Sequence, residues 1–143
     1  MNSDVAHVLV VDDSSTVRSA VTSKLLNIRV QVTEAADGLS AVQVLREKNV
    51  DLAIIDLNMP FFDGYDLLCF IRGHDRFKHL PALVLTSSDD QLSLSRALES
   101  GATAYLVKPL HWKAFGAHIE HLLHLHRSAR GCAKYHNGIR LRT

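Results

Sequence analysis

Short apolar runs alternate along this chain with longer segments in which apolar residues recur at helical spacing. This alternation limits the fold more than any other feature, because strands joined by crossover helices form a parallel sheet with helices on both faces. Five apolar runs predict five strands, and each is followed by a segment that predicts a helix. We therefore predict an α/β fold with a doubly wound, five-stranded parallel sheet. The predicted strands are residues 8–11, 30–35, 52–56, 82–86 and 104–107.

Local signals predict where the helices begin. Ser14 or Ser15 offers an N-cap for the first helix. Ser88 and Gln91 have the spacing of a capping box before the fourth helix. The last helix is expected over about residues 110–127 from its apolar period.

The composition is that of one folded domain. The chain has 143 residues, of which 47% are hydrophobic and 22% charged, and it is long enough to bury a core without disulfides or metals. Its longest aliphatic runs, 8–11 and 52–55, are far shorter than a membrane span of roughly 18 residues, and the N-terminus has no signal-peptide pattern. Cys69 and Cys132 show no partner spacing. These features predict a cytoplasmic protein with reduced cysteines.

Charge is divided unevenly along the chain. Residues 1–120 contain 11 Lys or Arg and 15 Asp or Glu, whereas residues 121–143 contain 5 Lys or Arg and no acid. An acidic body argues against nucleic-acid binding, and only the tail has the charge for it. We assign residues 1–127 to the domain and 128–143 to a basic tail. The tail is a disordered end, the start of a linker to an output domain, or an arm that binds a partner.

Polar residues stand where four of the five predicted strands end. Asp12 and Asp13 follow the first strand, Asp56 ends the third, Thr86 ends the fourth and Lys108 follows the fifth. In a doubly wound sheet the carboxyl ends of the strands form the ligand-binding edge. Converging carboxylates repel each other unless a cation is present, and oxygen ligands without His or Cys favour Mg²⁺. With a Lys and a Thr hydroxyl beside them, these residues predict a magnesium-dependent phosphoryl-transfer site.

This pattern resembles the receiver domain of two-component response regulators over roughly residues 5–127. The resemblance implies a flavodoxin-like strand order of 2-1-3-4-5. It also implies a cis peptide bond between Lys108 and Pro109. The matching motifs are Asp12-Asp13, Asp56, Met59-Pro60, Asp63-Gly64, Thr86 and Lys108-Pro109.

The resemblance further implies a chemistry for the acidic residues. Asp56 is expected to accept a phosphoryl group from a phosphohistidine on a sensor histidine kinase or a histidine phosphotransfer protein. Mg²⁺ is expected on Asp13, Asp56 and the backbone carbonyl of Asn58, with Asp12 reaching the ion through water. The chain is then a signalling module with no separate substrate, and not an enzyme in the usual sense.

A switch is also implied by the resemblance. Thr86 and Lys108 are expected to bind the phosphoryl oxygens, and Tyr105 in the fifth strand is expected to respond to Thr86. The signal would leave through the face formed by the fourth helix, fifth strand and fifth helix, toward a downstream protein. Two organisations stay open, a stand-alone regulator and a receiver that is part of a longer transcription factor or signalling enzyme.

Two other protein classes share parts of this pattern. An aspartate-nucleophile phosphatase of the haloacid dehalogenase type has a second Asp two residues after its nucleophile, but Ser14 stands at that position. A flavodoxin has a phosphate-binding loop after its first strand, where Asp12 and Asp13 would repel an anionic ligand. The phosphatase remains a remote alternative.

Two features of the sequence have no role in that site. His118, His121 and His124 form a stripe on the last predicted helix. A solvated or interface face is favoured there over a metal site, because no carboxylate stands nearby to orient the rings. Of the adjacent Phe61 and Phe62, we expect one in the core and one exposed.

Overall fold

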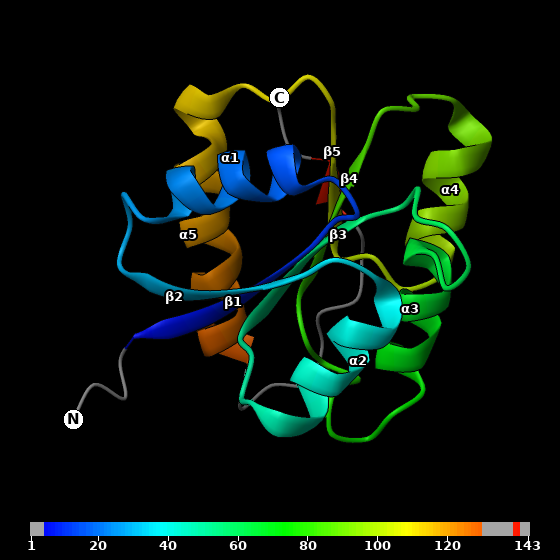
Figure 1. The fold of residues 1–143 in the computed structure, drawn as a ribbon, viewed down its shortest axis with the longest axis horizontal. Helices are drawn as coiled ribbons and strands as arrows, with labels where there is room; N and C mark the ends of the chain where they lie inside the picture. Colours follow the sequence, from blue (N-terminus) through cyan, green and yellow to red (C-terminus); the bar gives the residue numbers. More distant parts are fainter. Residues whose placement is uncertain (1–4, 130–138, 141–143) are drawn as a thin grey trace.

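The computed structural model describes residues 5–129 and 139–140, which form one parallel sheet between two layers of helices (Figure 1). All five predicted strand–helix units are present. The strands are β1 (Ala6–Val11), β2 (Val30–Ala35), β3 (Leu52–Asp56), β4 (Ala82–Thr86), β5 (Ala104–Val107) and β6 (Ile139–Arg140). The helices are α1 (Ser15–Leu25), α2 (Gly38–Glu47), α3 (Gly64–Arg72), α4 (Gln91–Glu99) and α5 (Trp112–Ala129).

The strands lie in the order β2-β1-β3-β4-β5-β6, and each neighbouring pair is parallel. The order of the first five strands confirms the flavodoxin-like prediction. The sixth strand, Ile139–Arg140, falls in the segment that the sequence assigns to the basic tail. A two-residue strand is too short to produce an alternating pattern, so no periodic signal marks it. Most of that tail, with Cys132, lies outside the described residues.

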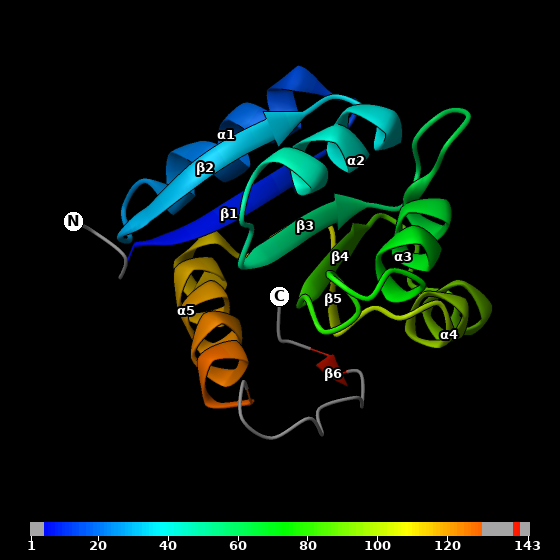
Figure 2. The ribbon, with the colours of Figure 1, turned by 90° about the horizontal axis from the view of Figure 1, so that it is seen from below.

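The core has two halves because successive residues of a strand point to opposite faces of the sheet. Leu9 and Ile55 pack on one face against α2, α3 and α4. Val10 and Ile54 pack on the other face against α1 and α5. Figure 2 shows the same division, with α1 and α5 on one side of the sheet and α2, α3 and α4 on the other. β3 and β4 are buried at every position, as expected of parallel strands covered on both faces.

The helix caps confirm one predicted boundary and correct another. The Ser14 hydroxyl caps α1 by accepting a hydrogen bond from the Val17 N–H at 3.3 Å. The predicted capping box of Ser88 and Gln91 is wrong, because α4 begins at Gln91 and its N-cap is Asp90. The Asp90 carboxylate accepts the Ser93 N–H at 2.8 Å, and the Ser88 hydroxyl bonds to the Asp90 carboxylate instead of to the helix.

A half-buried arginine joins three segments at the end of the sheet where β4 and β5 begin. Arg72, the last residue of α3, donates to the carbonyl of Leu80 at 2.6 Å and to the carbonyl of Gly101 at 2.8 Å. It also donates to the carbonyl of Lys78 and to the Thr103 hydroxyl, both at 3.2 Å. Burial lowers the pKa of Arg72 to about 10, so it stays charged at neutral pH.

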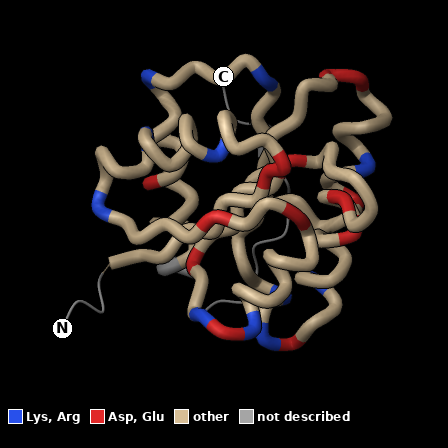
Figure 3. Tube along the Cα trace, viewed as in Figure 1, with Lys and Arg blue, Asp and Glu red and all other residues tan. Residues whose placement is uncertain are grey.

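The surface carries charges of both signs. In Figure 3 the Lys and Arg positions of the described chain are spread over separate elements and form no continuous basic track. Within the described residues, no helix combines the length and apolar character needed to cross a membrane.

Candidate functional site

The predicted site residues meet at the edge of the sheet formed by the carboxyl ends of the strands. Asp12 and Asp13 follow β1, and Asp56 is the last residue of β3. Lys108 follows β5 beside them. β1, β3 and β4 are adjacent in the sheet, so residues far apart in the sequence converge here without further loop structure.

Three carboxylates form the centre of the site. One carboxylate oxygen from each of Asp12, Asp13 and Asp56 lies within 4.8 Å of the others. Asp12 is 2% exposed and Asp56 is 5% exposed, whereas Asp13 is exposed to solvent. The Ser14 N–H donates to Asp12 Oδ1 at 2.9 Å, and the Asn58 N–H donates to Asp56 Oδ1 at 3.3 Å. These backbone donors fix the orientation of the two buried carboxylates.

One cation faces the two buried acids. Lys108 Nζ lies 3.6 Å from Asp12 Oδ2 and 3.7 Å from Asp56 Oδ1. A single ammonium does not neutralise two carboxylates, and Asp12 Oδ2 is buried without a hydrogen-bond partner. Burial, followed by the Asp12 charge, raises the pKa of Asp56 to about 6, although Lys108 opposes the rise. The site therefore has an excess of negative charge.

This excess fits a divalent cation. A buried carboxylate oxygen without a partner is rare in native structures and points to a missing ligand. Three carboxylates around one point are hard oxygen donors, the ligands that Mg²⁺ prefers. Within the described residues, no other group of three or more Asp, Glu, His or Cys side chains comes together in this way.

Thr86 ends β4 at the same edge and is 1% exposed. Its hydroxyl accepts the Ser88 N–H at 3.1 Å and lies 3.5 Å from the Ser88 carbonyl, to which it donates weakly. The hydroxyl is therefore engaged in a local turn, and it must leave that turn to bond a ligand. The peptide bond between Lys108 and Pro109 is cis, as the family resemblance implied.

Two further residues support the site, of which the sequence analysis named Gly64 only as part of a motif and missed Arg18. Arg18 Nη1 donates to the backbone carbonyl of Asp12 at 2.7 Å, and its Nε pairs with Glu34 Oε1 at 3.1 Å. No sequence signal marks the Arg18 contact, because it depends on the conformation of a long side chain. Gly64 opens α3 against the site, since a Cβ there would stand 2.7 Å from the Asp56 carbonyl oxygen. Only glycine allows so close an approach of backbone to backbone.

The loop after Asp56 holds the two adjacent phenylalanines. Phe62 is partly buried and packs against the core, whereas Phe61 is 101% exposed. The prediction of one core and one exposed ring is confirmed. Phe61 also has a φ of 65°, in the left-handed region that an aromatic residue seldom adopts.

Tyr105 lies in β5 and is 8% exposed, packed with the core residues that contact α3 and α4. Its ring is therefore inside in this structure. The histidine stripe on α5 is not part of a group of three metal-ligating side chains within the described residues. The apolar period from which that helix was predicted corresponds to a buried face, which includes Phe115, Ile119 and Leu122.

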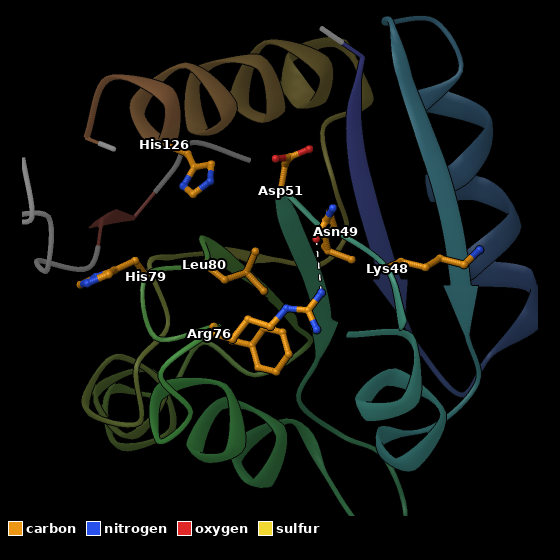
Figure 4. Close-up of a pocket in the computed structure, with 9 residues that line it drawn as sticks. Lys48, Asn49, Asp51, Arg76, His79, Leu80 and His126 are labelled. Carbon is orange, nitrogen blue, oxygen red and sulfur yellow. Dashed lines mark hydrogen bonds between the residues drawn. The ribbon is translucent and has the colours of Figure 1, made fainter. Parts of the chain in front are cut away.

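A separate pocket of about 340 Å³ lies near the opposite end of the sheet (Figure 4). Its lining includes Asp51 and Leu80, which come just before β3 and β4, and His126 on α5. Arg76 points toward Asn49 across this pocket and donates to its side-chain oxygen at 3.3 Å. None of the predicted site residues lines it.

Similarity to known proteins agrees with this site. The family model described as response regulator receiver domain matches residues 8–120. Chemotaxis protein CheY-3 of Vibrio cholerae is 39% identical over 103 residues, which cover 71% of this chain and 79% of that protein. The chain therefore belongs to the response regulator receiver domain family, whose standard function is to be phosphorylated by a histidine kinase.

Solved structures and longer relatives extend the comparison. The structure of Vibrio cholerae CheY4 has a TM-score of 0.78 and 30% identity, and the match covers 82% of this chain and 98% of that one. The receiver domain of Francisella response regulator 1452 has a TM-score of 0.77 and 28% identity, covering 84% and 98%. Sensor histidine kinase CheAY of Helicobacter pylori is 36% identical over 104 residues, 71% of this chain but 13% of that protein. Similar receivers thus occur both as most of a short protein and as a small part of a long one.

Proposed function

We propose that Asp56 accepts a phosphoryl group from a phosphohistidine on a sensor histidine kinase or a histidine phosphotransfer protein. A carboxylate oxygen of Asp56 forms the new P–O bond. The P–N bond to the donor imidazole breaks, and its electron pair returns to the imidazole. The observation that carries the proposal is the buried Asp56 carboxylate at the centre of an acidic cluster, with one Lys within 3.7 Å.

The neighbouring side chains have separate roles in this proposal. Lys108 can form an ion pair with a phosphoryl oxygen on Asp56, because its ammonium already faces that residue. Thr86 offers a hydroxyl that can donate to a phosphoryl oxygen once it leaves Ser88. Asp56 must be ionised to act as a nucleophile, and its raised pKa makes its charge state sensitive to the cations around it.

Mg²⁺ is the proposed cofactor. Asp13, Asp56 and the backbone carbonyl of Asn58 would hold it, with Asp12 reaching it through water. When bound, the ion neutralises the carboxylates and the phosphoryl oxygens that meet there. Asp12 Oδ2, which is buried without a hydrogen-bond partner, supports this placement.

Labelling with acetyl phosphate and Mg²⁺ tests the assignment. The parent chain should gain one phosphoryl group that is labile in alkali, and Asp56→Asn should gain none. Asp75→Asn is the matched control, because Asp75 is a fully exposed acid that pairs with Lys78 at 3.7 Å. Undiminished labelling of Asp56→Asn, or mapping of the label to a serine, would contradict the proposal. Sustained turnover of a phosphate monoester would instead support the remote phosphatase alternative.

The proposed output is a change in the face formed by α4, β5 and α5, which then binds a downstream protein or an output domain. A histidine kinase donor also places the chain in the cytoplasm. Backbone NMR shifts on adding beryllofluoride and Mg²⁺ test the output face. Changes should extend from the site into these three elements, and changes confined to the loops around Asp56 would contradict this part of the proposal.

A further inference from the structure

The chain returns to the sheet after α5. β6 pairs in parallel with the first half of β5, with Ile139 opposite Ala104 and Arg140 opposite Tyr105. Figure 2 shows β6 as a short piece beside β5 at the border of the sheet. Without this pairing, β5 would be the edge strand, because the order of the other strands ends there.

We propose that the free edge of β5 is a docking site for an extended segment and that the segment around Ile139–Arg140 occupies it in cis. An edge strand presents unpaired N–H and C=O groups, which readily accept an added strand from the same or another chain. The cis segment therefore competes with any other protein that would add a strand to β5.

The connection permits this pairing. α5 ends at Ala129 and β6 begins at Ile139, so residues 130–138 link them. Nine residues reach up to about 30 Å when extended. The register places β6 beside the start of β5. α5 runs toward this end of the sheet, so the chain leaves the helix near the position of β6 (Figure 1). A parallel pair needs a crossover of roughly a dozen residues, and α5 with its linker supplies more than that.

The properties of β5 and of the tail favour docking. Ala104 and Leu106 are 0% and 2% exposed, so β5 is a buried, apolar strand. Residues 128–143 carry four basic side chains and no acid, whereas residues 1–120 carry more acids than bases. This attraction of opposite charges adds to the backbone pairing. A tethered segment also acts at an effective concentration on the order of millimolar, which an untethered strand must overcome through tighter binding.

A functional consequence rests on the proposed function. β5 belongs to the proposed output face, and β6 is in register with Tyr105. The C-terminal segment would then be a built-in competitor of the downstream partner, and only a partner that displaces it could use the edge of β5.

Hydrogen exchange on the full chain tests the docking. The double variant Ile139→Pro/Arg140→Pro removes both backbone N–H groups of β6, including the one that faces β5. The amides of Ala104–Val107 that point toward β6, which lie on alternate residues, should then exchange about tenfold faster than in the parent chain. The matched control Ile139→Ala/Arg140→Ala loses the same side chains but keeps both donors, and it should stay close to the parent. Exchange in β2, at the far border of the sheet, should be equal in all three chains.

Parent-like exchange of β5 in the double proline variant would overturn the proposal. Equally fast exchange in the double alanine variant would also overturn it, because backbone pairing would then not hold the segment. A synthetic peptide of residues 128–143, added to the double proline variant, should restore the protection of β5. A scrambled peptide of the same composition should not restore it. Equal protection by both peptides would mean that charge alone causes the protection, and this would overturn strand docking.

These outcomes are independent of the proposed phosphorylation. No phosphodonor is used, and the double proline variant should still accept label at Asp56. Loss of β5 protection together with normal labelling separates the docking from the chemistry of the site.

Discussion

Two charged sites lie at opposite ends of the sheet, and they differ in how completely the fold supplies their hydrogen-bond partners. Arg72, near the start of β4 and β5, is a single cation that donates to three carbonyls and one hydroxyl. Asp12 and Asp56, at the other end, share one Lys108 at 3.6 and 3.7 Å, and Asp12 Oδ2 has no hydrogen-bond partner. The fold itself supplies hydrogen-bond partners for Arg72, whereas the carboxylates at the other end lack partners that a ligand could supply.

This difference in hydrogen bonding distinguishes a charge that stabilises the fold from charges that form a binding site. A buried charge with all its hydrogen bonds made holds segments together, and removing it leaves the partners unsatisfied. A buried charge without enough partners costs stability until a ligand arrives, and such unbalanced clusters mark binding sites. Substitution at the two ends should therefore shift the free energy of unfolding in opposite directions.

Arg72→Met should give the largest effect. The variant keeps the apolar stem but leaves the carbonyls of Gly101 and Leu80 without this donor, so the free energy of unfolding should fall by about 3 kcal/mol. Denaturant unfolding measures this loss. Arg76→Met is the control, because Arg76 is exposed and its removal should cost less than about 1 kcal/mol. Similar losses in both variants would show that the hydrogen bonds of Arg72 do not stabilise the fold more than those of an exposed arginine.

Asp56→Asn should act in the opposite direction in the absence of Mg²⁺. The pKa of Asp56 is raised to about 6 from an ordinary value of 3.8, so the folded state holds its proton more tightly than the unfolded state. Stability from this group is present at low pH and is lost as the pH rises from about 4 through 6. Asparagine cannot ionise, and at pH 7.5 the variant should be more stable than the parent by about 2 kcal/mol.

Unfolding of both chains with EDTA between pH 4 and 7.5 measures the difference. The advantage of Asp56→Asn should grow as the pH rises and level off above the pKa of Asp56. A constant difference across this range would mean that ionisation of Asp56 is not its cause.

The same contrast explains what the sequence could predict. Asp12, Asp56 and Lys108 each end a strand or follow one directly, so the parallel topology alone brings them together. Arg72 gave no such signal, because its partners come from loops whose path depends on packing. The Arg18 contact with the Asp12 carbonyl likewise depends on a side-chain conformation that helical spacing does not fix.

Backbone pairing over long range was also beyond the sequence. β6 has two residues and pairs with β5 more than thirty positions away, which no local period reveals. The cap of α4 was misassigned for a local reason. Ser88 and Asp90 both have capping side chains, and the sequence does not show that Ser88 bonds to Asp90 and leaves Asp90 to cap the helix.

Mg²⁺ should offset part of the stability lost to repulsion in the acidic cluster, and this effect should be smaller than those of the two variants above. An ion that binds only the folded chain stabilises it by about 1.4 kcal/mol at ten times its Kd. Millimolar Mg²⁺ should therefore raise the Tm of the parent chain over that in EDTA. Asp13→Asn should lose most of this rise, and Asp75→Asn should keep it. An unchanged rise in Asp13→Asn would place the ion away from the acidic cluster.

The smallest expected effect is the coupling between the acidic end and the core, carried by Thr86 and Tyr105. The Thr86 hydroxyl is engaged with Ser88, and Tyr105 is buried, so this structure represents one of two proposed states. A phosphoryl group can favour the other state only by the free energy of the contact it gains with the hydroxyl, about 1 kcal/mol.

Thr86→Ala removes that contact and keeps Asp56, so it should accept the phosphoryl mimic beryllofluoride while the ring of Tyr105 no longer changes its environment. NMR of the Tyr105 ring measures the response, and Thr86→Ser, which keeps the hydroxyl, should respond like the parent chain. If Tyr105 shifts as fully in Thr86→Ala as in the parent, the hydroxyl is not the link. The structural change at Asp56 would then reach Tyr105 by another route, because Asp56 would still bind the mimic in the absence of the Thr86 hydroxyl.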